Sequence, residues 1–131
     1  ERLRLERQRM QTAQARYRVN RNGSWYNTDQ RGANLLRQAI QEGYRQGLQA
    51  GRADRNRRVG LNWGGSSVYR SGSYGYQSYV DRSQYQYYFR QGFERGYQDG
   101  YNSRNQYGTY NNGVGDILGS ILGSILNVQR Y

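Results

Sequence analysis

Glycines and apolar side chains recur at helical spacing in two long segments of the chain. One segment covers about residues 30–57, where leucine, isoleucine and tyrosine flank glycines spaced four apart; in the other, about residues 82–104, the flanking residues are aromatic. The two rows are Gly43, Gly47 and Gly51, and Gly92, Gly96 and Gly100. A period of three to four residues predicts an α-helix with each glycine row along one side. We therefore expect two helices, each with a glycine edge.

The two segments repeat each other at a separation of 49 residues. A glycine inside a helix costs about 1 kcal/mol relative to alanine, so close packing against another helix must compensate. We predict an αα-hairpin in which the glycine edges face each other and aromatic rings lie over the opposite backbone. The rings assigned to this contact are Tyr44, Phe93, Tyr97 and Tyr101. Glycine edges that face a neighbouring subunit remain the alternative.

The residues before the first helix predict a basic helical arm, residues 1–23, with helical spacing over residues 2–19 and a thin apolar stripe. Its arginines are assigned to contact with a polyanion or another subunit: Arg2, Arg4, Arg7, Arg9, Arg16 and Arg18. Residues 24–105 hold the helical repeat pair, and their Gly/Ser/Tyr-rich connector, residues 59–80, is predicted to be irregular. The fold class expected from these patterns is mainly α.

The last segment, residues 106–131, combines a turn with a short apolar helix over about residues 116–127. One side of that helix is apolar, and we assign it to subunit assembly: Ile117, Leu118, Ile121, Leu122, Ile125 and Leu126. The other side continues a third glycine row, Gly115, Gly119 and Gly123, interleaved with serine. About 12 residues span roughly 18 Å, too short to cross a bilayer. We expect this tail to pack against other subunits and not to contact a membrane.

The composition changes this picture in one respect. Only 34% of the 131 residues are hydrophobic, and leucine, isoleucine, valine and phenylalanine together make up less than a fifth of the chain. That fraction is typical of chains that bury too little apolar surface to order alone. We therefore expect neighbouring subunits or a ligand to supply part of the order.

The residue types that the chain lacks argue against catalysis. It has no His, no Cys and no Lys, so the usual ligands of zinc and haem, the Ser-His pair and the Walker-type lysine are missing. Its nine acidic residues form no recognisable paired-carboxylate motif. We predict no enzyme activity, no catalytic residue, no metal or cofactor, and no small-molecule substrate.

The net charge of +11 comes entirely from arginine and is concentrated in the first half of the chain. Such an excess is typical of proteins that bind nucleic acid or an acidic polysaccharide, although a solvated basic surface would have the same composition. The chain begins with Glu1 rather than Met. We take it for a processed export product and expect it outside the cell or at the cell surface.

The pattern Glu-Gly-Tyr-x-x-Gly-x-x-x-Gly-x-x-Asp over residues 42–54 returns as Gln-Gly-Phe-x-x-Gly-x-x-x-Gly over residues 91–100. It resembles uncharacterised exported bacterial proteins with paired Gly-Tyr-rich helical repeats. The likeness covers about residues 30–105; it implies export and a pair of helices, but this family has no assigned activity and implies no functional residue. The second repeat departs from the pattern at Ser103, where the first has Asp54.

Two functional hypotheses follow from the sequence. The first is a self-assembling structural protein, the subunit of an extracellular filament or surface layer, held by glycine-edged helices and by arginine stacked on tyrosine between subunits. The second is a polyanion-binding protein that uses its arginine-rich N-terminal half. The first predicts a homo-oligomer or polymer, and the second a nucleic acid or acidic polysaccharide as partner.

Overall fold

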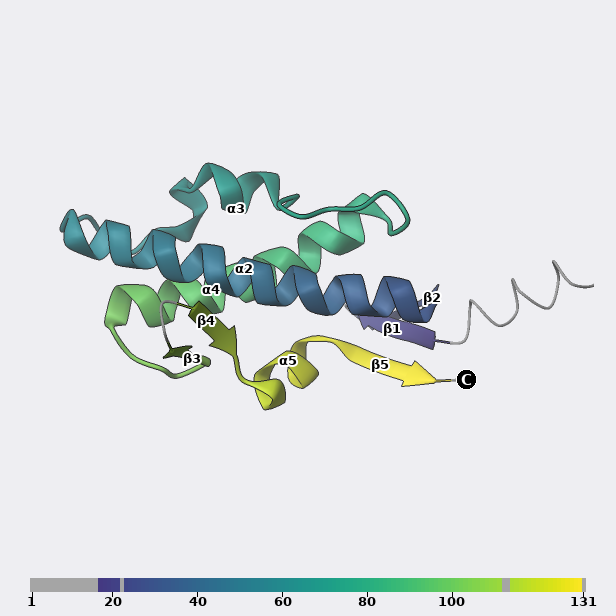
Figure 1. Cartoon of the computed structure of the whole chain (residues 1–131). Coiled ribbons are helices and arrows are strands. Elements are labelled where there is room, and N and C mark those ends of the chain that lie inside the picture. Colours follow the sequence, from purple (N-terminus) through teal and green to yellow (C-terminus); the bar gives the residue numbers. More distant parts are fainter. Residues whose placement is uncertain (1–16, 22, 112–113, 131) are drawn as a thin grey trace, which may run out of the picture.

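The computed structural model describes residues 17–21, 23–111 and 114–130. Two long packed helices dominate it, and small antiparallel sheets accompany them (Figure 1). In chain order the elements are β1 (Tyr17–Arg21), β2 (Ser24–Thr28), α2 (Gln30–Asn56), the 3₁₀ turn η1 (Trp63–Gly65), α3 (Ser67–Ser71), α4 (Arg82–Asn102), β3 (Gly108–Asn111), β4 (Val114–Ile117), α5 (Gly119–Ile125) and β5 (Asn127–Arg130). The prediction of two long helices is confirmed; helices dominate the fold, but it is not purely α, because small antiparallel sheets accompany them.

Aspartates cap the N-termini of both long helices. The side chain of Asp29 accepts a hydrogen bond of 2.7 Å from the Gly32 N–H, and Asp81 accepts one of 3.2 Å from the Gln84 N–H. Each bond satisfies an N–H that has no partner within the helix. Helix α4 ends at Ser103, whose φ of 52° places it in the left-handed region. These local signals fix where the two helices begin and where α4 ends.

The two helices run parallel, so the predicted αα-hairpin is wrong. A Cβ atom on Gly43 would lie 2.0 Å from the carbonyl oxygen of Phe89, and one on Gly51 would lie 2.2 Å from that of Tyr97. Residue numbers therefore rise in the same direction along both helices, as Figure 1 shows. A hairpin needs a connection of about 2–8 residues, whereas the segment between these helices is long enough to return along their full length.

The contact between the helices is symmetric. A Cβ on Gly47 would meet the Phe93 carbonyl oxygen at 2.1 Å, and a Cβ on Gly96 would meet the Tyr44 carbonyl oxygen at 2.0 Å. Gly47 aligns with Gly96 in the repeat, and Tyr44 aligns with Phe93. The two helices therefore contact each other through equivalent faces, at equivalent positions along their axes. Backbones this close allow weak Cα–H···O contacts, which are available only where no Cβ intervenes.

The connector returns over one side of the helix pair, and the strands and α5 lie on the opposite side (Figure 1). It is less irregular than predicted, since it contains η1 and α3. Its backbone is bound to α4 by tyrosine hydroxyls: Tyr101 Oη donates to the Val59 carbonyl at 2.6 Å, and Tyr97 Oη accepts from the Asn62 N–H at 3.1 Å.

Residues 17–21 form a strand, so the helical arm predicted to reach residue 23 is wrong over this part; its residues 1–16 lie outside the described residues. Strand β1 is central in the antiparallel sheet β2-β1-β5, and its Val19 is fully buried. Strands β1 and β2 close on the pair Arg21↔Ser24, with Gly23 at a φ of 83° in the turn. The two residues between these strands are Asn22 and Gly23. An Asn-Gly pair favours a two-residue hairpin, because both residue types tolerate the positive φ that the turn requires.

The C-terminal segment also differs from the prediction of one continuous helix. Only Gly119–Ile125 is helical, between strands β4 and β5. Its glycines do not form a third packed edge, because no atom lies within 4 Å of a Cβ placed on Gly119 or Gly123. Tertiary contacts explain the difference: Gln41 and Arg45 of α2 bind the carbonyl oxygen of Gly115 at 2.9 Å each and hold that backbone extended in the β3–β4 hairpin.

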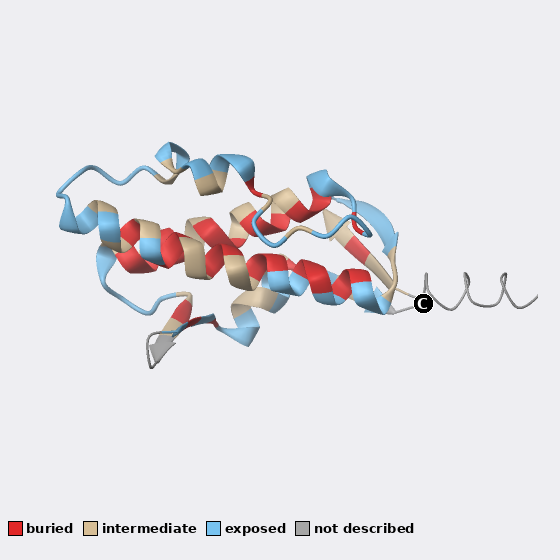
Figure 2. Cartoon of the chain, turned by 45° about the horizontal axis from the view of Figure 1, so that its top comes forward, coloured by how far each residue is buried: buried red, intermediate tan, exposed pale blue. Residues whose placement is uncertain are grey.

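The core lies between α2 and α4, where the facing sides of both helices are buried while the connector is mostly exposed (Figure 2). Within the described residues, no helix is both long and apolar enough to cross a membrane.

Candidate functional site: a basic groove beside α4

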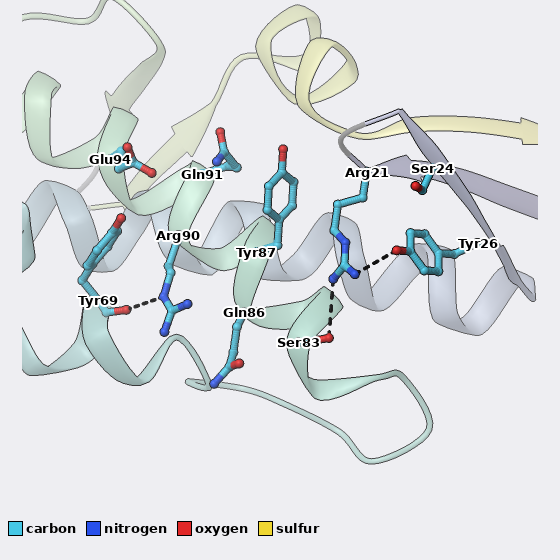
Figure 3. A pocket seen from close by; sticks show the side chains of 10 residues that line it. All are labelled: Arg21, Ser24, Tyr26, Tyr69, Ser83, Gln86, Tyr87, Arg90, Gln91 and Glu94. Atoms are coloured by element: carbon cyan, nitrogen blue, oxygen red, sulfur yellow. Dashed lines mark hydrogen bonds between the residues drawn. The ribbon is translucent and has the colours of Figure 1, made fainter.

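An open groove of about 430 Å³ runs along the outer side of α4 (Figure 3). Its residues come from the β1–β2 hairpin, from α3 and from α4, so three separate segments of the chain meet there. They carry hydroxyl, amide and guanidinium groups and one carboxyl: Arg21, Ser24, Tyr26, Tyr69, Ser83, Gln86, Tyr87, Arg90, Gln91 and Glu94. We take this groove as the candidate binding site.

Arg21 lies at one end of the groove, where strand β1 ends. Its Nη2 donates to Tyr26 Oη at 3.1 Å and its Nη1 reaches Ser83 Oγ at 3.5 Å (Figure 3). The guanidinium carbon lies 4.7 Å from the centre of the Tyr26 ring, the geometry of a cation–π contact. These hydrogen-bond partners are neutral. The hydrogen bond from Ser83 lowers the pKa of Asp81, and Arg21, which interacts with that carboxylate through charge alone, contributes to the shift.

Arg90 lies further along α4 and holds α3 in place. Its Nε donates to the Tyr69 carbonyl at 3.0 Å, and its Nη2 donates to the Arg70 carbonyl. Both carbonyls belong to the end of α3, where backbone oxygens lack helical partners and a cation is favoured. Arg90 therefore has a structural role, but its positive charge still faces the groove.

Glu94 is the carboxyl group of the groove. Burial raises the pKa of Glu94, and the neighbouring Arg95 charge and the Tyr69 hydroxyl oppose that rise. Burial also raises the pKa of the Tyr69 hydroxyl, and the Glu94 charge adds to the effect. Both shifts have the cause expected of partly desolvated acids. The pair gives this end of the groove a hydrogen-bond acceptor next to a hydroxyl donor.

Amide side chains lie along the α4 side of the groove. Gln86 donates to the Ser71 carbonyl at 2.8 Å through Nε2, and Gln91 accepts from Arg95 at 3.2 Å through Oε1. Each amide therefore keeps one end for a ligand. With two guanidiniums and several hydroxyls, the groove can bind oxyanions and hydroxyl groups.

A second hollow, of about 630 Å³, lies under the first half of the connector and has a different character. Alanine, valine, leucine and glycine line much of it, and its one carboxyl group, Asp54, binds Tyr97 Oη and Arg57. Hydrogen bonding to Tyr97, followed by Arg57, lowers the pKa of Asp54. The charged groups of this hollow thus bond to each other.

The helix glycines assigned from the sequence, Gly43 to Gly51 and Gly92 to Gly100, all lie in the contact between α2 and α4. The rings of Tyr44, Phe93 and Tyr97 are fully buried, and the partly buried Tyr101 stacks on Tyr97 at a centroid distance of 6.0 Å. These residues form the core of one chain and leave no glycine edge of α2 or α4 for a neighbouring subunit.

The tail residues divide into three groups. Ile117 and Leu126 are buried, and Ile121, Leu122 and Ile125 pack partly buried against the same core. Leu118 is 38% exposed. Gly115 is buried in β4, where a Cβ would meet the Leu48 side chain at 2.7 Å.

Of the arginines assigned to polyanion contact, Arg2 to Arg16 lie outside the described residues. Arg18 lies in β1, donates to Gln129 Oε1 at 2.7 Å and lies over the Trp25 ring at 4.5 Å. Sequence reasoning missed Arg21 and Arg90 as a pair because they lie 69 positions apart in the chain, with the whole of α2 and the connector between them. The local signal is the nearness of tyrosine to each arginine in the sequence: Tyr17 and Tyr26 lie on either side of Arg21, and Tyr87 and Tyr88 precede Arg90.

No protein-family model, curated protein or solved structure matches the chain. The resemblance to exported proteins with Gly-Tyr-rich repeats therefore stays a prediction. Among the described residues, no cluster of carboxylate, imidazole or thiol side chains could hold a metal ion.

Proposed function

We propose that this chain is a binding protein for anionic polymers and that the groove beside α4 is its binding site. The observation that carries the proposal is the placement of Arg21 and Arg90 on an open groove in which Glu94 is the sole acid. A recess with this balance of charge attracts anions and repels cations. The net charge of +11 adds long-range attraction for a polymer that extends beyond the groove.

The other acidic side chains of the described residues support this interpretation, because each is bound within the chain. Two cap helices, and Asp99 is buried. Glu42 and Asp116 pair with Arg45 at 3.2 and 2.9 Å, and Asp54 pairs with Arg57. Little negative charge remains to oppose an anionic ligand.

The proposal is tested by titrating the protein with fluorescently labelled heparin fragments at several salt concentrations. Affinity should fall steeply as salt rises, because binding releases counterions. Arg21→Gln should weaken binding about fivefold, the effect of roughly 1 kcal/mol for one charged contact. The matched control is Arg55→Gln, because Arg55 is exposed, lies in the last turn of α2 and does not line the groove. Equal affinity for both variants, or binding that salt does not weaken, would contradict the proposal.

A second candidate function is self-association, as in a filament or surface layer. The supporting observation is apolar surface at the start of the tail, where Val114 is 46% and Leu118 is 38% exposed. Glycine-edged packing no longer supports it, since α2 and α4 use those edges on each other. Sedimentation of the wild type and of Leu118→Gln distinguishes the cases: assembly should be lost in the variant, and a monomeric wild type would exclude this function.

For localisation we propose the outside of the cell or its surface, where acidic polysaccharides are abundant. Cell fractionation of the native producer tests this, and a cytoplasmic location would contradict it.

A further inference from the structure

Most of the exposed aromatic side chains of the described residues lie against an arginine. The exposed rings are Trp25, Tyr26, Tyr74 and Tyr79. Three of them lie under an arginine: Arg18 is 4.5 Å from the centre of Trp25, Arg21 is 4.7 Å from Tyr26, and Arg31 is 3.7 Å from Tyr79. The partly buried rings of Tyr76 and Tyr69 follow the same pattern, with Arg82 at 5.1 Å and Arg90 at 5.9 Å. Guanidinium groups thus cover one face of most rings that a ligand could reach.

This arrangement disfavours single-stranded nucleic acid. Proteins bind single strands largely by stacking bases on open aromatic faces, at about 1–3 kcal/mol per base. Here a base that stacks on the covered face of such a ring would have to displace the arginine, and the cation–π contact would be lost. In the groove, two of the three rings, Tyr26 and Tyr69, are the partners of its two arginines, and the third ring, Tyr87, packs edge-to-face against Tyr88.

The same arrangement suits carboxylate and sulfate groups. A guanidinium that lies over a ring still presents, at its edge, the N–H groups that are not bonded within the chain, and two such groups match two oxygens of a planar or tetrahedral oxyanion. In Arg90 this leaves mainly Nη1, because Nε and Nη2 bind carbonyls of α3. The ring holds the arginine in place, so little side-chain entropy is lost when the anion binds.

The remaining groups of the groove favour a sugar polymer. Glu94 is an acceptor that a sugar hydroxyl can donate to, whereas a continuous row of phosphodiesters would be repelled by it. Gln86 and Gln91 add amide groups on the same side of α4. Acidic sugars carry both charged groups and neutral hydroxyls, and the groove holds guanidinium groups for the former and carboxyl and amide oxygens for the latter.

We propose that the ligand is an acidic polysaccharide, whose carboxylate or sulfate groups bind the ring-stacked arginines and whose hydroxyls bind Glu94 and the glutamines. This inference rests on the proposed function and narrows it. The ligand class is narrowed from anionic polymers in general to acidic polysaccharides, on the basis of the arginine–ring contacts and the Glu94 carboxyl.

The test compares three ligands of equal charge number at one salt concentration: an oligouronate, a heparin fragment and single-stranded DNA. We expect at least one of the sugars to bind tenfold or more tightly than DNA, and the stronger of the two identifies carboxylate or sulfate as the recognised group. Failure of all three to bind would overturn the proposed function. DNA that binds as tightly as both sugars would overturn this inference and leave polyanion binding intact.

Two variants sharpen the comparison. Arg21→Lys keeps the charge but loses the planar fork, so sugar affinity should fall severalfold while DNA affinity stays unchanged. Glu94→Gln keeps the size and an acceptor oxygen but removes the charge. DNA affinity should therefore rise, and the ratio of sugar affinity to DNA affinity should decrease. Circular dichroism and thermal unfolding show whether each variant is folded. If folded variants shift sugar and DNA affinities by the same factor, the groove does not discriminate, and the inference is wrong.

Discussion

At the scale of single residues, the best-defined polar site is the buried Asp99. Its side chain, 1% exposed, accepts hydrogen bonds from Tyr44 Oη at 2.9 Å and from the backbone N–H groups of Gln106, Tyr107 and Gly108 at 3.1, 2.9 and 3.1 Å. The Asp99 side chain therefore joins α2, α4 and the start of β3. Burial and the bond to Asp99 raise the pKa of Tyr44, which keeps this hydroxyl a donor.

The Asn variant of Asp99 tests this network. Asp99→Asn replaces one acceptor oxygen with an N–H₂ group that faces donors, so at least one buried donor loses its partner. We expect a loss of about 3 kcal/mol in the free energy of unfolding, measured by urea denaturation. Tyr44→Phe, which removes a single bond, should cost about 1–2 kcal/mol. A smaller loss for Asp99→Asn than for Tyr44→Phe would show that the backbone bonds contribute little.

At the scale of elements, the glycine rows decide how α2 and α4 pack. Every close neighbour of a Cβ placed on Gly96 is backbone, with the carbonyl oxygen of Tyr44 at 2.0 Å and the nitrogen of Leu48 at 2.9 Å. Backbone cannot move aside as a side-chain tip can. The parallel helices can approach this closely only where these positions lack a side chain.

Alanine substitutions separate packing from helix propensity. Gly96→Ala should lower the free energy of unfolding by about 3 kcal/mol, because the clash outweighs the gain of about 1 kcal/mol in helix propensity. Gly119→Ala, in a helix where a Cβ meets nothing within 4 Å, should be neutral or raise stability by up to about 1 kcal/mol. Chemical denaturation of both variants measures the difference. Equal effects at the two sites would mean that α2 and α4 do not pack through glycine.

At the scale of the whole molecule, the described residues build a core of their own. Tyrosine and phenylalanine from α4 supply much of it, together with leucine and isoleucine from α2. Buried tyrosine hydroxyls find partners, as in Tyr88 Oη to the Asn20 carbonyl at 2.8 Å, so tyrosine can take the place of aliphatic residues. The low aliphatic content therefore does not require a neighbouring subunit for order.

Dilution tests this conclusion about the whole molecule. If each chain folds by itself, its Tm should stay constant on serial dilution to concentrations at which it sediments as a monomer. Differential scanning fluorimetry follows the transition through the tyrosine and tryptophan emission. A Tm that keeps falling with dilution in that range would show that contacts between chains hold the fold together, as the composition alone predicts.

Local signals and repeats could be predicted well. The capping aspartates, the helical period and the glycine rows involve residues that act within one turn or recur at a fixed spacing. The sheet could have been predicted in part, because Asn22-Gly23 between Arg21 and Ser24 is a hairpin signal. The pairing of Val19 with Val128 could not, since nothing local relates residues over a hundred positions apart.

The groove beside α4, our candidate binding site, belongs to the part that the sequence does not show. Arg21, Tyr69 and Arg90 lie on three elements, and each has ordinary neighbours along the chain. The return of the connector brings α3 beside α4, and the β1–β2 hairpin lies at the start of the same helix. Their meeting is a consequence of the parallel arrangement.

By itself, the sequence determined two helices with glycine edges, an excess of positive charge carried by arginine and the absence of His, Cys and Lys, because these follow from spacing and composition. Only the tertiary structure decided that the helices run parallel, that their glycines contact each other and that the tail turns into strands. The reason is physical: direction and partner depend on which distant backbones can approach, and that is set by the whole chain at once.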